Sequence, residues 1–423
     1  GAVLPSALAC ALLGARVVEW YPASDAQSEL AISHDIVRGS RSEGTEHPKQ
    51  ISVDAAYASD LLSDAKKAAI GQAAEEIDPD SSWYLASSPG FGSVQFYLGL
   101  SQRDFVNRAK SILQSETADE TRVVHLGAPM RYFPFIRCIA GLIQGHTIVE
   151  NSDAAFWSEN RVTKITGWPG HIPELLAQQW EGFKVSQLEI YGGDISEDEL
   201  SDLFSVFDEI EVTFDTASTG KIWSGWYRPT HTKGDTPSDQ FFGATVEVLN
   251  NQGFEVESGK VGILRVKTDV SAPLSVIHRT EGNNPVQGDW IYPGLIGQQN
   301  AENGIVILGH ALDDVLSIQE QAIFGPEIDT FLKSISGIVD AVAFGNPKSE
   351  RDEIIAFAVF QKGVNPYQKA ELAKLETSEK LGEVFAPSII RAVNAIPETK
   401  EGFPDREACG LMIMTAAHRE KSE

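Results

Sequence analysis

The sequence has few cysteines, few basic residues and no long apolar run. Its three cysteines, Cys10, Cys138 and Cys409, are scattered without a CxxC pair, so neither a structural zinc site nor a disulfide framework is predicted. Such usage is typical of a reducing compartment, and we expect a cytoplasmic protein. No stretch of about 18 apolar residues occurs, so no membrane span is expected. Lys and Arg number 34 against 60 Asp and Glu, for a net charge of −26, which disfavours nucleic acid and membranes as partners because both require a basic face.

The remaining composition is that of a globular protein. The chain has 423 residues, of which 42% are hydrophobic and 22% charged, enough for two or three domains. The apolar segment 2–13 resembles the core of a signal peptide, but it lacks a basic flank and leads into the strand-like segment 16–20. A helix followed by a strand is therefore predicted there.

Helical and strand patterns alternate over the first 240 residues. A helix is expected over 54–74, another begins at Ser101 with a capping pattern, and short strands are expected at 82–88, 123–126, 147–150, 187–191 and 211–214. This alternation predicts a mostly parallel sheet. Further strands at 244–249, 262–266 and 304–308 are separated by Gly and Asn turns, which predicts a small antiparallel sheet or barrel. The fold class is thus α/β: a large N-terminal domain over 1–309, with a β subdomain at about 240–309, and a small α+β C-terminal domain over 310–423.

A Ser/Gly turn follows the strand at 82–88. Ser87, Ser88, Gly90 and Gly92 are residues whose hydroxyl and N–H groups can bind phosphate. A working phosphate loop also supplies a cation, whereas no Lys or Arg follows here until Arg103. Taken alone, the turn is better interpreted as a surface turn.

The order of segments resembles the adenylate-forming superfamily of acyl- and aryl-CoA synthetases, luciferases and peptide-synthetase adenylation domains. The turn at 87–96 corresponds to the family's phosphate loop, and segment 128–133 to its Ala-Pro-Leu-Phe-His motif. The glycine pair at 192–193, the strand at 262–266 and the segment 324–329 match three later motifs. The resemblance runs from residue 3 to about 406 and implies a shortened member, with the family's N-terminal portion largely absent.

Four departures from the family pattern fall on positions that handle ATP. Gln95 and Phe403 stand where the family has lysines, and Leu295 stands where an aspartate binds the ribose hydroxyls. The segment 214–218 replaces the family's Tyr-Gly-x-Thr-Glu motif and lacks its Thr and its metal-side Glu. Lys400 lies three residues before Phe403 in an expected turn and is not predicted to replace the lysine.

These departures imply a degenerate member that has no catalytic residues and no cofactor. Adenylate formation joins two anions, a carboxylate and a phosphate, so cations supply the main stabilisation of its transition state. The alternative is an active AMP-dependent acyl- or aryl-acid CoA ligase that uses ATP, Mg²⁺ and CoA. Under the first reading the partner is a small carboxylic or aryl ligand, or else a carrier protein or pathway enzyme.

The family's acyl pocket has counterparts in this chain. A candidate ligand pocket is expected from Arg131, Tyr132, Phe133, Gly192, Gly193, Phe214, Asp215 and Thr216. Paired glycines at a strand end let a flat ligand approach the backbone closely, although the same glycines also suit an ordinary turn. Arg131 and Arg137 could pair with a ligand carboxylate, although Arg137 is rather expected to face solvent.

Some other residues carry simpler expectations. His125 is expected to be a hydrogen-bonded structural residue, His146 and His171 to be solvated turn residues, and segment 223–227 to be a loop. No metal site is predicted. Because Phe403 replaces the lysine, the C-terminal domain is expected to stay in one orientation or to be loosely tethered, without a response to CoA.

Overall fold

The computed structural model describes residues 17–18, 78–88, 96–113, 122–126, 132–149, 153–180, 182–192, 195, 197–229, 238–241, 243–268, 275–278, 286–299, 304–319, 321–347, 353–399 and 402–420. The helices expected over 2–13 and 54–74 lie outside these residues. So do several site residues named from the sequence: Gly90, Gly92, Gln95, Arg131, Gly193 and Lys400.

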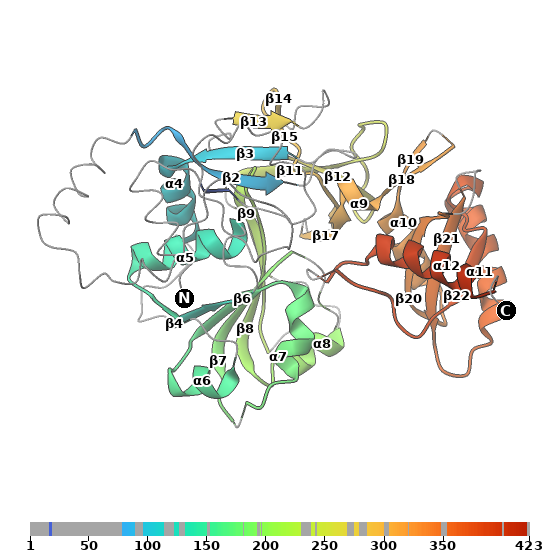
Figure 1. The fold of residues 1–423 in the computed structure, drawn as a ribbon, viewed down its shortest axis with the longest axis horizontal. Helices are drawn as coiled ribbons and strands as arrows, with labels where there is room; N and C mark the ends of the chain where they lie inside the picture. The colour runs from blue at the N-terminus through green and yellow to red at the C-terminus, as the bar shows by residue number, and fades with distance from the viewer. Residues whose placement is uncertain are drawn as a thin grey trace, which may run out of the picture.

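A seven-stranded sheet forms the centre of the large part of the molecule (Figure 1). Its parallel strands lie in the order β8 (Phe207–Thr216), β7 (Val185–Tyr191), β6 (Lys164–Gly167), β4 (Arg122–His125) and β5 (Thr147–Val149). The antiparallel strands β9 (Gly220–Tyr227) and β10 (Ser238–Phe241) extend the sheet beyond β8. The predicted parallel α/β sheet is confirmed.

The expected loop at 223–227 is wrong, because these residues belong to β9. Trp223 pairs with Phe214 of β8 and with Phe241 of β10, so the segment is hydrogen-bonded on both sides. Aromatic residues favour a half-buried strand surface over a loop.

Helices cover the sheet. The helices α6 (Ala154–Glu159), α7 (Ile172–Leu176) and α8 (Glu197–Leu203), together with the short turn η3 (Pro169–His171), connect the parallel strands, while α5 (Tyr132–Gln144) joins β4 to β5. The first ten residues of α5 are all buried, as expected for a helix that is apolar on all sides.

A second, four-stranded sheet packs on α5 and on α4 (Gln102–Leu113). It has the order β1 (Val17–Val18), β2 (Ser82–Ser88), β3 (Phe96–Ser101) and β13 (Ser275–His278). The predicted strand at 82–88 is confirmed. At the start of α4, the Asp104 N–H donates to Ser101 Oγ at 3.0 Å and the Ser101 N–H donates to Asp104 Oδ2 at 3.1 Å. This reciprocal pair confirms the expected capped helix start.

The small antiparallel sheet follows in the chain. Its strands are β11 (Ala244–Leu249), β12 (Val261–Thr268), β14 (Val286–Gln287), β15 (Trp290–Ile291), β16 (Leu295–Gln299) and β17 (Ile305–His310). All of its pairings are antiparallel, which confirms the expected change of architecture after residue 240.

We call residues 311–420 the tail, which forms a separate body at one end of the molecule, coloured orange to red in Figure 1. It contains α9 (Ala311–Asp314), β18 (Val315–Ile318), β19 (Gln321–Phe324), α10 (Gly325–Ser334), β20 (Ile338–Gly345), β21 (Ile354–Phe360), α11 (Pro366–Lys380), η4 (Glu383–Phe385), β22 (Ile389–Ala392) and α12 (Arg406–Glu420). Two hydrophobic clusters lie entirely within it. Over the described residues of the whole chain, none of the helices has the length and hydropathy needed to cross a bilayer.

Candidate functional site

The carboxyl ends of the parallel strands define the candidate site. In open α/β sheets, ligands bind in the crevice outside these strand ends. Tyr132 at the start of α5, Gly192 directly after β7, and Asp215 and Thr216 at the end of β8 come from this edge. The structure thus brings together residues that the sequence placed in one pocket.

Most of these residues contact other side chains of the protein. The ring of Phe133 lies 5.6 Å from that of Trp168 and 5.0 Å from that of Tyr191, between ring centroids. Phe214 is buried in the main core. Gly192 has φ +61°, and a Cβ built there would lie 3.1 Å from Ile307 Cδ1. The glycine therefore permits both a left-handed turn and close packing of the small β sheet.

Arg137 is buried beneath this edge, so the expectation that it faces solvent is wrong. Its Nε donates to Glu189 Oε1 at 2.9 Å, and its Nη1 forms an ion pair with Asp215. The Tyr132 hydroxyl donates to the second oxygen of Asp215 at 3.3 Å. Because α5 is enclosed between two sheets, a guanidinium on this part of the helix can be accommodated only by pairing with buried carboxylates.

The buried charges shift the pKa values of their neighbours. Burial alone raises the pKa of Glu189, but the positive charges of Arg137, Lys164 and Lys221 together hold that pKa well below its usual value. Lys164 Nζ lies 3.0 Å from Glu189 Oε2. Burial and the neighbouring Asp215 raise the pKa of the Tyr132 hydroxyl. The site therefore holds Glu189 as an anion and Tyr132 as a neutral donor.

His125, at the end of β4, has the structural role that was expected. Its Nδ1 lies 2.7 Å from Thr166 Oγ1 on the adjacent strand β6. Burial, and then the positive charge of Lys164, lower its pKa to about 3. The imidazole is thus neutral at physiological pH and is not a cation available to bind phosphate.

A second buried acid, Glu211, lies opposite Glu189 in the register of β7 and β8. Its Oε1 pairs with Lys221 Nζ at 2.7 Å and accepts from Ser224 Oγ at 2.6 Å. These residues were missed from the sequence. The signal was an acid directly between two apolar residues in each strand, at 188–190 and at 210–212, which indicates an internal cation partner.

The turn between β8 and β9 contains a cluster of hydroxyls. Thr216 Oγ1 lies 2.8 Å from both Ser218 Oγ and Thr219 Oγ1, and it accepts from the Thr219 N–H at 3.2 Å. The Ser218 hydroxyl therefore forms a hydrogen bond within its own turn.

Leu295 and Phe403, which were singled out from the sequence, are both buried. Leu295 and Phe403 belong to the same hydrophobic cluster as Phe214 and the core of the large part. Phe403 comes from the tail, and the ring of His310 contacts it with centroids 5.3 Å apart and planes at 83°. The segment around Phe403 thus crosses from the tail to the large part of the molecule.

His146 and His171 were both expected to be solvated turn residues, and the structure places them differently. His146 is buried at the end of α5, so the expectation of a solvated turn residue is wrong. His171 lies in η3, is partly exposed, and accepts the Trp168 N–H at its Nδ1 at 3.0 Å.

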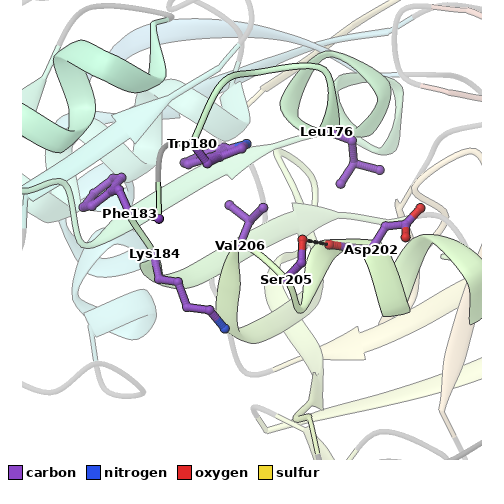
Figure 2. A pocket seen from close by; sticks show the side chains of 8 residues that line it. Leu176, Trp180, Phe183, Lys184, Asp202, Ser205 and Val206 are labelled. Carbon is purple, nitrogen blue, oxygen red and sulfur yellow. Dashed lines mark hydrogen bonds between the residues drawn. The ribbon is translucent and has the colours of Figure 1, made fainter.

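A separate hollow of about 420 Å³ lies near the amino ends of β7 and β8. Figure 2 shows Trp180 and Phe183 on one side of it and Asp202 and Ser205 on another. It is at the opposite edge of the sheet from the candidate site. It therefore has no part in the site described above.

Comparison with known proteins supports one family. No family model matches the chain. An acetyl-coenzyme A synthetase of Methanothrix soehngenii is 31% identical over 124 residues, which is 27% of this chain and 18% of that protein. The enzyme of the same name from Chromobacterium violaceum is 24% identical over 176 residues, or 38% of this chain and 26% of its own length. The matched stretches thus span about a quarter or less of these relatives.

Solved structures share the fold. The ATP-bound MatB of Rhodopseudomonas palustris has a TM-score of 0.58 at 14% identity, covering 81% of this chain and 72% of that one. The O-succinylbenzoate coenzyme A synthetase of Bacillus subtilis in complex with AMP has a TM-score of 0.56 at 16% identity, covering 82% and 76%. The chain is therefore similar in sequence to acetyl-coenzyme A synthetases over part of its length, and it shares the fold of these solved structures.

Proposed function

We propose that this chain is a non-catalytic member of the adenylate-forming superfamily. One observation carries the proposal: Leu295 and Phe403, at the positions of the family's ribose-binding aspartate and late lysine, are buried with Phe214 in a single apolar cluster. An apolar cluster offers neither acceptors for ribose hydroxyls nor a cation for phosphate.

The charges near this cluster do not compensate for the loss. Attack of a carboxylate on a phosphate is accelerated by fixed cations at the reacting oxygens. Arg137, a buried cation beneath this edge of the sheet, has its guanidinium paired with Glu189 and Asp215. Among the residues that the structure describes, no group of three or more His, Cys, Asp and Glu side chains is placed to hold a metal ion. The pairing of Arg137 supports the proposal that the described residues do not hold ATP with Mg²⁺.

The role proposed for the protein is binding, either of a small carboxylic or aryl molecule or of a carrier protein or pathway enzyme. Internal contacts of the expected pocket residues favour the second role. Tyr132 donates to Asp215, and Phe133 packs on Trp168 and Tyr191. A small ligand at these positions would have to displace contacts that the chain already makes. Native mass spectrometry of freshly purified protein separates the two roles by the mass of what is retained.

The proposal is tested with nucleotide. Millimolar ATP with Mg²⁺ is expected to leave the melting temperature unchanged, because only a ligand that binds the native state stabilises it. ATP–pyrophosphate exchange over a panel of acids is expected to equal the background without protein, with an active acetyl-coenzyme A synthetase as the positive control. A clear rise in melting temperature together with exchange would refute the proposal and support the alternative of an active AMP-dependent acid–CoA ligase.

A further inference from the structure

We infer that the turn carrying Phe403 is an aromatic latch, which holds the tail closed over the carboxyl edge of the central sheet in the absence of nucleotide. The inference goes beyond the loss of catalysis. It concerns the resting orientation of the tail and what must move before any molecule reaches the sheet edge.

The first step is the shape of the turn itself. The Gly402 N–H donates to Thr399 O at 3.0 Å, the Thr399 N–H to Phe403 O at 2.7 Å, and the Asp405 N–H to Pro397 O at 2.8 Å. These hydrogen bonds tie the backbone of Gly402, Phe403 and Asp405 to that of Pro397 and Thr399. Because this backbone is held before Phe403 docks, docking costs correspondingly little conformational entropy.

The second step is contact between the two parts of the molecule. A Cβ built on Gly402 would lie 2.7 Å from Gly170 N and 3.1 Å from Pro169 C, which are backbone atoms of η3 at the end of β6. The tail backbone thus touches the large part without room for a methyl group. Phe403 beside it is only 6% exposed and lies in the core cluster of the large part. Burial of a phenylalanine side chain contributes favourable free energy to this contact.

The third step connects the latch to α9, which we call the hinge helix because it joins β17 of the small β sheet to the rest of the tail. Asp314 Oδ2 accepts the His310 N–H at 2.6 Å, and Asp314 Oδ1 accepts from Arg406 Nε at 2.6 Å. Arg406 also donates to Asp329 of α10 at 2.6 Å. His310 packs on Phe403, so the end of β17, the hinge helix α9 and the latch form one continuous set of contacts.

It follows that docking of Phe403 and access to this part of the sheet edge are mutually exclusive. The tail has to release Phe403 before a ligand or partner can contact Gly170 or the apolar cluster that contains Phe403. The closed state is held by packing and by hydrogen bonds within the chain, so no nucleotide is needed to maintain it.

The test is a matched pair of glycine substitutions. Gly402→Ala places a methyl group against the backbone of Gly170, whereas Gly363→Ala places one in open space. Both glycines are in the tail and have nearly the same φ, +88° and +92°, so both variants carry the same backbone strain. Phe403→Ser provides a second route, through the side chain.

Hydrogen exchange is measured for peptides that cover 168–172 and 402–405, with small-angle scattering on the same samples. We expect Gly402→Ala and Phe403→Ser to speed exchange in both peptides at least tenfold and to increase the radius of gyration, while Gly363→Ala matches wild type. Protection of β20 and β21 checks that the tail stays folded. The latch is refuted if neither variant exposes 168–172 beyond the Gly363→Ala level, or if the wild-type protein is already expanded. Because no nucleotide is present, this outcome is independent of the test of catalysis above.

Discussion

Two buried arginines, each held between two carboxylates, lie in different parts of the molecule. Arg137 on α5 pairs with Glu189 of β7 and Asp215 of β8, so all three groups belong to the large part. Arg406 at the start of α12 pairs with Asp329 of α10 and with Asp314 of the hinge helix α9. Both networks consist of one arginine and two carboxylates, but they join different helices and strands.

The two networks are therefore expected to stabilise different parts of the molecule. Arg137 joins a helix to the sheet beneath it, so its contacts are formed whenever the large part is folded. Arg406 joins α12 to α10 and to α9, all within the tail. A buried pair is costly to break by removing one partner, whichever role it has. The consequences of breaking each pair should therefore appear in different regions.

The largest effect is expected from Arg137→Met. The substitution leaves Glu189 and Asp215 buried without their cation, which costs about 3–5 kcal/mol of unfolding free energy. We expect the urea midpoint of the large part to fall sharply. The control is Arg228→Met, which removes an exposed ion pair with Glu209 and is expected to cost less than about 1 kcal/mol. Equal losses in the two variants would show that the buried network does not stabilise the large part.

A smaller and more local effect is expected from Arg406→Met. Asp314 and Asp329 lose their shared partner, so the hinge and α10 are destabilised by a similar type of penalty, confined to the tail. Hydrogen exchange should rise in α9, α10 and β20, with the large-part urea transition near its wild-type midpoint. A fall of the large-part transition as deep as that of Arg137→Met would contradict the division of roles.

The smallest effect is expected from pH, and its sign differs between the two regions. Folding lowers the pKa of His125 to about 3, so its contribution to stability is complete above its unfolded pKa, about 6.5, and is lost as pH falls toward 3. Each pH unit in that window costs at most about 1.4 kcal/mol. Glu189, with its pKa also lowered, loses its contribution below the usual carboxyl range.

The tail interface is expected to respond in the opposite direction. Burial raises the pKa of Glu327, and burial with nearby Asp340 and Glu199 raises that of Glu398. Carboxyls with raised pKa values favour the folded contact at low pH and weaken it as pH rises. In the large part, by contrast, the lowered pKa of His125 should make the urea midpoint fall between pH 7 and pH 5. His125→Gln should reduce this dependence of the urea midpoint on pH. An unchanged wild-type midpoint over this range would show that His125 is not buried as a neutral group.

The sequence predicted elements whose pattern is local. The strands β2 and β11 have the predicted bounds, and the capped start of α4 was visible in Ser101 and its neighbours. Leu295 and Phe403 could be singled out because the motifs of the family that the sequence resembles give the corresponding positions a defined role; the replacement itself stays a prediction. Both kinds of prediction depend on residues that are close together in the chain.

The buried charge network was not predictable in the same way. Arg137 is 52 residues from Glu189 and 78 from Asp215, so neither partner appears in a local pattern. On a single helix, arginine is ordinarily a solvent-facing residue. Only the enclosure of α5 between two sheets reverses that expectation.

The pairing of Glu189 with Glu211 in the register of β7 and β8 has a consequence for how the molecule folds. Two carboxylates that face each other on neighbouring strands repel, so the strand pair alone is an unfavourable intermediate. Arg137 arrives with α5 and Lys221 arrives with β9, and each neutralises one of the acids. The central strands therefore gain their full stability only when the helix and the next strand are already in place, which makes the sheet and its covering helix a single cooperative folding unit.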